Sequence, residues 1–137
     1  MPFPLTEYRV YKLYFSGYNH IWGWASWRRV WQSYDVEMKL WPEVRDNGWL
    51  QDLLGDYKLA QYWRQIFDRV YLGEIDTWDY QWTFACWVQI CLTILPNVNL
   101  VCNIAFNEDA THTSHENNKL ANIPAAAMDF PLRHPLL

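Results

Sequence analysis

The sequence predicts a mixed α/β fold, an α+β fragment in which helices dominate and only three or four short strands appear. Two observations lead to this expectation. Apolar residues recur at helical spacing over one long segment and several shorter ones, whereas stretches rich in β-forming residues are short and few. Three or four short strands are too few to complete a sheet of their own. We therefore expect residues 1–137 to form one domain that supplies half of a larger sheet.

The first elements are expected before residue 35. Tyr8–Phe15 alternates apolar and polar side chains and is rich in β-formers, which predicts a strand. His20–Trp24 is predicted to form a short aromatic loop or strand. Ser26 is a suitable N-cap for a helix over residues 27–34.

The clearest helix is expected over residues 56–72, with Asp56 capping its start and Gly73 ending it. Before it, Pro42 opens a short helical segment that ends at residues 47–48. Apolar side chains at three- and four-residue spacing give the long helix one apolar stripe. The stripe consists of Leu59, Tyr62, Trp63, Ile66, Phe67, Val70 and Tyr71.

A further helix is expected over residues 78–89, with Asp76 or Thr77 as its N-cap. Two short strands follow, over residues 93–95 and 100–104. The chain then becomes polar, which predicts a mobile loop over residues 107–118. The proline-containing tail, residues 124–137, is expected to be extended and frayed.

The composition favours a protein that handles sugars. Ten Trp among 137 residues is far above ordinary usage. Such a chain has either a large aromatic core or flat apolar faces for a ligand. A pyranose suits such a face, because its C–H bonds lie against an indole ring while its hydroxyls bond to polar neighbours.

The charge argues against nucleic acid as a partner, because the net charge is −4 and the basic residues are scattered. The apolar stretches are too short for a transmembrane span, and the first residues do not resemble a signal peptide. These observations predict a cytoplasmic protein. Its three cysteines, Cys86, Cys91 and Cys102, are then expected to be buried reduced thiols.

The first candidate for chemistry is the segment Asp76–Trp82, where Asp79 stands among Trp78, Tyr80 and Trp82. Sugar transfer with inversion needs a carboxylate that takes the proton from the acceptor hydroxyl. Asp79 would be fixed in the first turn of a helix beside an aromatic platform. The same pattern is also typical of a core helix whose first-turn acid complements the helix dipole.

Two further segments are candidates. His112, in the polar loop, could bind a metal or a diphosphate, although a solvent-facing loop is the favoured explanation because no residues here have metal-ligand spacing. Trp22 and Trp24 flank Gly23, which lets the backbone pass close to a flat ligand or to another strand. Arg28 could hold a phosphate with two parallel hydrogen bonds, whereas the alternative is a packed aromatic core beside a solvated helix face.

Six segments, spread over almost the whole chain, are similar to segments of one bacterial family. The chain resembles the proteins called hemolytic protein HlpA-like, which are also described as family 2 glycosyltransferases or nucleotide-diphospho-sugar transferases. The segments are Tyr14–Ser16, His20–Arg29, Leu40–Glu43, Asp76–Trp82, Leu92–Leu100 and Ala110–Thr113. Their order also looks like the acceptor half of the N-acetylglucosaminyltransferases that build complex N-glycans.

The resemblance implies the acceptor-side, carboxyl-terminal half of a GT-A-type glycosyltransferase. Asp79 matches the catalytic base of a W-D-D-W motif, except that Tyr80 replaces the second acid. By resemblance, Trp22, Trp24, Arg28, Trp78 and Trp82 would bind substrate, and His112 would meet a metal or the donor diphosphate.

The implied activity transfers a sugar from a nucleotide-sugar to a glycan or lipid-linked acceptor, assisted by Mn²⁺ or Mg²⁺. In the family, a first half binds the nucleotide and the metal. We expect this chain alone to be inactive and not to bind the metal, and a separately encoded first half to restore transfer. The alternatives are a carbohydrate-binding module without catalysis and a purely structural fragment.

Overall fold

A computed structural model describes residues 12–102 and 123–133. The described chain divides into two compact units. Residues 12–16, 20–24, 92–102 and 123–133 form what we call the strand unit, and Gly17–Asn19 with Ala25–Cys91 form the helical unit. Each unit is described by itself.

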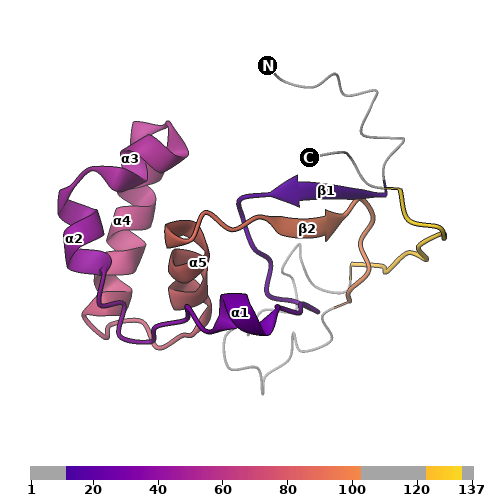
Figure 1. The fold of residues 1–137 in the computed structure, drawn as a ribbon, viewed down its shortest axis with the longest axis horizontal. Coiled ribbons are helices and arrows are strands. Elements are labelled where there is room, and N and C mark those ends of the chain that lie inside the picture. The colour runs from indigo at the N-terminus through magenta and orange to yellow at the C-terminus, as the bar shows by residue number, and fades with distance from the viewer. Residues whose placement is uncertain (1–11, 103–122, 134–137) are drawn as a thin grey trace. The chain divides into compact units, whose positions relative to one another are not determined.

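The strand unit contains one antiparallel pair, β1 (Leu13–Ser16) and β2 (Thr93–Pro96), drawn as two arrows in Figure 1. Leu13 pairs with Pro96 and Ser16 with Thr93. The described part of the tail is hydrogen-bonded to this unit rather than frayed. The amide of Ala126 donates to the carbonyl of Asn99 at 2.7 Å, and the amide of Lys12 donates to the carbonyl of Arg133 at 2.7 Å.

The helical unit contains all the helices of the described residues (Figure 1). They are α1 (Arg28–Trp31), α2 (Trp41–Asp46), α3 (Trp49–Leu54), α4 (Tyr57–Tyr71) and α5 (Asp79–Val88). The long helix α4 begins and ends as its sequence predicts. The carboxylate of Asp56 accepts the amide of Leu59 at 2.8 Å, and Gly73 takes the left-handed conformation that ends the helix.

The core of the helical unit is aromatic and lies between α4, α5 and α2. Trp41 packs edge-on against Phe67 and Phe84, with ring centroids 5.3 and 5.7 Å away. Helix α5 is buried all round over residues 81–87, which is typical of a central helix. The buried residues of the cluster are Met38, Trp41, Leu50, Ala60, Phe67, Val70, Phe84 and Trp87.

The buried indoles keep hydrogen-bond partners for their N–H groups, as burial requires. Nε1 of Trp41 donates to Oδ1 of Asp68 at 3.0 Å. Nε1 of Trp87 donates to the carbonyl of Gly17 at 2.8 Å. The second bond connects the segment Gly17–Asn19 to α5, although this segment and the helix are distant in sequence.

Several local predictions are wrong. Ser26 does not cap α1: Trp27 is the N-cap residue, and the Ser26 hydroxyl donates to the carbonyl of Trp27 at 3.3 Å. Helix α1 ends at Trp31 instead of residue 34. The N-cap of α5 is Trp78, without a side-chain cap, instead of Asp76 or Thr77.

Other differences concern strands and burial. No strand forms over the described part of 100–104, whereas residues 20–24 form a loop, one of the two predicted alternatives. Helix α3 was not predicted. Cys86 is buried as expected, but Cys91 is partly exposed and Cys102 is exposed, and all three thiols are free. The predicted strand over residues 8–15 is described only from residue 12, and the loop 107–118 lies outside the described residues.

The described residues combine helices with a small two-stranded sheet, which confirms the mixed α+β class in general. The GT-A-type arrangement stays a prediction. Among the described residues, no helix is both long and apolar enough to span a membrane.

Candidate functional site

Asp79 is the first residue of α5, as the sequence predicts, and is half-buried. Its carboxylate accepts a hydrogen bond from the hydroxyl of Thr77, two residues earlier. Thr83, one turn later, donates its hydroxyl to the carbonyl of Asp79 at 3.0 Å. These contacts fix the carboxylate at the end of a buried helix.

Two tyrosines lie within electrostatic reach of Asp79. Partial burial, and then the negative charge of Asp79, raise the pKa of the Tyr34 hydroxyl. The same two causes, in the same order, raise the pKa of Tyr80. Both hydroxyls therefore stay protonated at neutral pH and remain able to donate hydrogen bonds. A carboxylate acceptor is thus near phenolic donors.

A stacked aromatic pair lies beside α5. The rings of Trp31 and Tyr34 are nearly parallel, at 6°, with centroids 4.8 Å apart. Trp82 packs against both rings, at 5.1 Å from Trp31 and 6.4 Å from Tyr34. We call Trp31, Tyr34 and Trp82 the aromatic platform. Trp31 is 43% exposed, whereas Trp82 is only 4% exposed, so Trp31 carries most of the accessible indole surface.

The predicted site residues of the helical unit therefore differ in how exposed they are. Trp78 is 41% exposed and precedes Asp79 directly. Trp82 was expected to bind substrate, but it is only 4% exposed and packs against Trp31 and Tyr34, so little of its ring is open to a ligand. Arg28, at the start of α1, is exposed. The guanidinium carbon Cζ of the neighbouring Arg29 lies 5.2 Å from the centre of the Trp27 ring.

The remaining predicted residues are in other parts of the chain. Trp22 and Trp24 belong to the strand unit, where Trp22 is exposed and Trp24 is half-buried. Between them, Gly23 adopts φ +62°, and a Cβ built on it would lie 2.5 Å from Cγ2 of Val101. Gly23 therefore serves a close approach within this unit. His112 lies outside the described residues.

Two buried amide atoms of the helical unit have no hydrogen-bond partner, Oε1 of Gln81 and Nδ2 of Asn19. Gln81 is only 6% exposed, although it sits in the predicted catalytic segment. The side-chain oxygen Oδ1 of Asn19 lies 3.0 Å from the Thr83 hydroxyl, whose single proton is shared between this oxygen and the Asp79 carbonyl. Of the buried polar side chains on α5, Thr83 is the one that contacts the first turn, through the Asp79 carbonyl.

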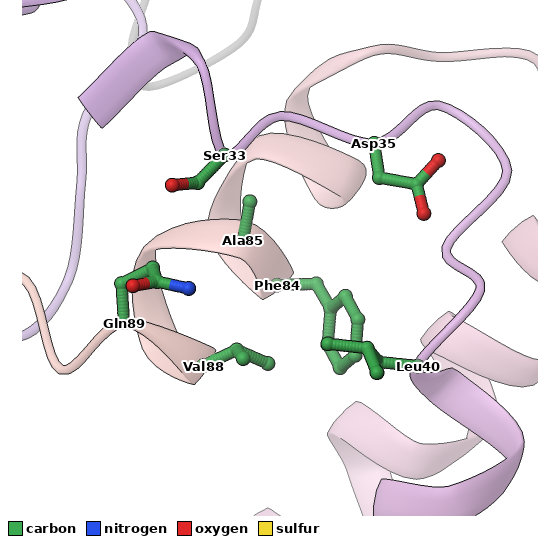
Figure 2. Close-up of a pocket in the computed structure, with 7 residues that line it drawn as sticks. All are labelled: Ser33, Asp35, Leu40, Phe84, Ala85, Val88 and Gln89. Atoms are coloured by element: carbon green, nitrogen blue, oxygen red, sulfur yellow. The ribbon is translucent and has the colours of Figure 1, made fainter. Parts of the chain in front are cut away.

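A separate small pocket lies between α5 and the segment that leads to α2 (Figure 2). Leu40, Phe84, Ala85 and Val88 give it an apolar lining, with Ser33, Asp35 and Gln89 around them. The Asp35 carboxylate is engaged, because it accepts the amides of Glu37 and Lys39 at 3.0 and 2.9 Å. No predicted site residue lines this pocket.

Among the described residues, no group of three or more His, Cys, Asp or Glu side chains could hold a metal ion. The resemblance implies that Mn²⁺ or Mg²⁺ binds to the other half of the family fold. This finding therefore does not test that expectation. Comparison with models of protein families, with curated proteins and with solved structures finds no match.

Sequence reasoning missed Trp31 and Tyr34, the stacked half of the platform. A signal was present, because aromatic residues at positions 27, 31 and 34 recur at helical spacing. The sequence predicts a helix over residues 27–34 and assigns no role to Trp31 or Tyr34. The helix ends at Trp31, and the turn after it brings Tyr34 back onto the indole.

Proposed function

We propose that this chain binds a carbohydrate acceptor on the aromatic platform and presents an acceptor hydroxyl to Asp79. The parent activity is transfer of a sugar from a nucleotide-sugar to a glycan or lipid-linked acceptor. The stacked pair of Trp31 and Tyr34, with Asp79 in electrostatic reach of Tyr34, is the observation that carries the proposal.

The platform suits a sugar ring physically. An exposed indole that is stacked on one ring and packed against a second is held rigidly, and its accessible part offers an apolar surface. A sugar needs hydrogen-bond donors and acceptors at the edge of that surface. The Tyr34 hydroxyl and the Asp79 carboxylate are groups of these two kinds.

In the transfer step, the Asp79 carboxylate would accept the proton of the acceptor hydroxyl while the oxygen attacks the anomeric carbon. The bond from that carbon to the diphosphate breaks, and the nucleoside diphosphate leaves with the bonding electrons. The donor and its Mn²⁺ or Mg²⁺ are assigned to the first half of the family fold. This half supplies acceptor binding and the proton acceptor.

A second candidate is a carbohydrate-binding module without catalysis. The hydrogen bond from Thr77 to the Asp79 carboxylate favours it, because it gives that carboxylate a structural role at the start of α5. Under this alternative the platform binds glycan, and Asp79 only stabilises the helix end.

The substitution Asp79→Asn separates the two candidates. Transfer from labelled nucleotide-sugars should be measured with this chain combined with a first half of the family, because the chain alone is expected to be inactive. Loss of the base should lower the transfer rate about a hundredfold or more while glycan binding changes little. The matched control is Asp76→Asn, at an exposed position three residues earlier.

Transfer that stays within a few-fold of the wild-type rate in Asp79→Asn would rule out Asp79 as the base. If the glycan is still bound in that case, the binding module is the better description. Sugar transfer by the chain alone would overturn the expectation that it needs a donor-binding half.

A further inference from the structure

The C-terminal turn of α5 folds the chain back on itself between Cys86 and Cys91. Ile90 adopts the left-handed conformation, with φ 51°, and donates its amide to the carbonyl of Trp87 at 2.9 Å. The amide of Cys91 then donates to the carbonyl of Cys86 at 2.9 Å. This six-residue closure is the bonding pattern of a Schellman-type helix end.

The closure brings the two cysteines within disulfide distance. Disulfides bridge Cα atoms roughly 4.4–6.8 Å apart. The Cys91 amide nitrogen bonds directly to the Cys86 carbonyl, and summed bond lengths put the two Cα atoms at most about 7 Å apart. Because this path is bent, their separation is shorter than that limit and suits a disulfide. At these two positions of a Schellman-type helix end the side chains commonly contact each other, and the proximity of Cys91 is one of the causes that raise the pKa of the Cys86 thiol. Both residues belong to the helical unit, and Cys91 is its last residue.

The two thiols differ in access. Cys86 is 6% exposed, inside the buried stretch of α5, whereas Cys91 is partly exposed in the turn after it. An accessible thiol that contacts a buried one is the arrangement in which the first can react with a solution partner and the second can then displace that partner.

We propose that Cys86 and Cys91 form a reversible intramolecular disulfide by exchange with a low-molecular-weight organic disulfide. The thiolate of Cys91 attacks one sulfur of the reagent, which gives a mixed disulfide and releases one reagent thiol. Cys86 then loses its proton to solvent, and its sulfur attacks the Cys91 sulfur and releases the second reagent thiol. The protein is oxidised by two electrons, and the reagent is reduced to two thiols.

Electrostatics supports this order of attack. Burial, and then the contact with Cys91, raise the pKa of Cys86 to about 12. At neutral pH Cys86 is therefore almost entirely protonated and is a poor first nucleophile for a reagent in solution. Its attack on Cys91 is intramolecular, and the high effective concentration across the turn offsets the small thiolate fraction.

The test uses the full chain with Cys102→Ser, which removes the exposed third thiol. The folded protein is equilibrated in glutathione buffers from fully reduced to mostly oxidised. Acid quenching, alkylation and peptide mass mapping follow. We expect one intramolecular bond between Cys86 and Cys91, seen as the loss of two hydrogen atoms, and its complete reversal by excess reduced glutathione.

Matched variants test the mechanism. In Cys86→Ser, oxidation should stop at a mixed disulfide on Cys91, with at least tenfold more glutathione adduct than in the parent. In Cys91→Ser, which changes only the turn position, Cys86 should stay unmodified in the folded protein. Two free thiols in every buffer, or a glutathione adduct on Cys91 that persists while Cys86 is present, would overturn the proposal.

Discussion

Asp79 and Tyr34 form the polar part of the proposed site, and their chemistry is complementary. The carboxylate only accepts hydrogen bonds, whereas the Tyr34 hydroxyl is protonated at neutral pH, and burial and the charge of Asp79 raise its pKa further. A sugar hydroxyl both donates and accepts. This pair could therefore satisfy it on both sides, which is the residue-scale basis of the proposed acceptor binding.

Also at the residue scale, Cys86 should make stability depend on pH in alkaline solution. Its pKa in the folded chain, about 12, lies above the ordinary value of 9.0. The unfolded chain therefore loses this proton first. The contribution to stability is complete below pH 9 and is lost as pH rises from 9 toward 12, at about 1.4 kcal/mol per pH unit.

The measurement is urea unfolding between pH 8.5 and 10 under reducing conditions. Over this interval the wild type should lose about 1 kcal/mol more free energy of unfolding than Cys86→Ala, because only the wild type titrates at this position. The tyrosines and lysines are common to both proteins and cancel in the comparison. Parallel pH profiles would contradict the burial of this thiol.

At the scale of elements, α4 shows how far local signals predict structure. Its cap Asp56 and its terminating Gly73 act as the sequence predicts. Its apolar stripe does so only in part, because Phe67 is buried whereas Tyr62 is exposed. Such signals depend only on neighbours along the chain. Pro42, in the first turn of α2, is a second local signal that the structure confirms.

The element predictions that are wrong depend on tertiary contacts. Ser26 matches the chemistry of a cap, yet α1 begins after Trp27 without one. Helix α3 begins after Gly48 in the left-handed conformation and buries Leu50, so the glycine that seemed to end one helix also starts the next. In the site, the position of Asp79 was predictable, but the pairing of Trp31 with Tyr34 depends on how the chain turns after α1.

The cap of α4 gives an element-scale prediction. Removing the Asp56 side chain leaves the amide of Leu59 without its partner. Asp56→Ala should therefore lower the free energy of unfolding by about 1 kcal/mol. Asp56→Asn, which keeps the acceptor oxygen, should stay within a few tenths of wild type in the same chemical denaturation experiment. Equal losses in both variants would show that the carboxylate acts by charge instead of capping.

At the scale of the whole molecule, the many aromatic side chains have two roles. Trp41, Trp87 and their neighbours build the core of the helical unit, with hydrogen-bonded indole N–H groups. Trp31 and Trp78 remain 43% and 41% exposed near the start of α5. The composition predicted either a large aromatic core or exposed apolar faces, and the structure contains both. Only the structure assigns individual tryptophans to each.

Carbohydrate binding by the platform is the central claim, and a glycan array with intrinsic Trp fluorescence tests it most directly. The wild-type chain should bind at least one glycan class and change its fluorescence on binding. Trp31→Ala should weaken that binding about tenfold, which corresponds to about 1.4 kcal/mol. Tyr57→Ala, which removes a 68% exposed ring on α4, should stay within twofold of wild type. No glycan binding by the wild type, or equal losses in the two variants, would contradict the claim.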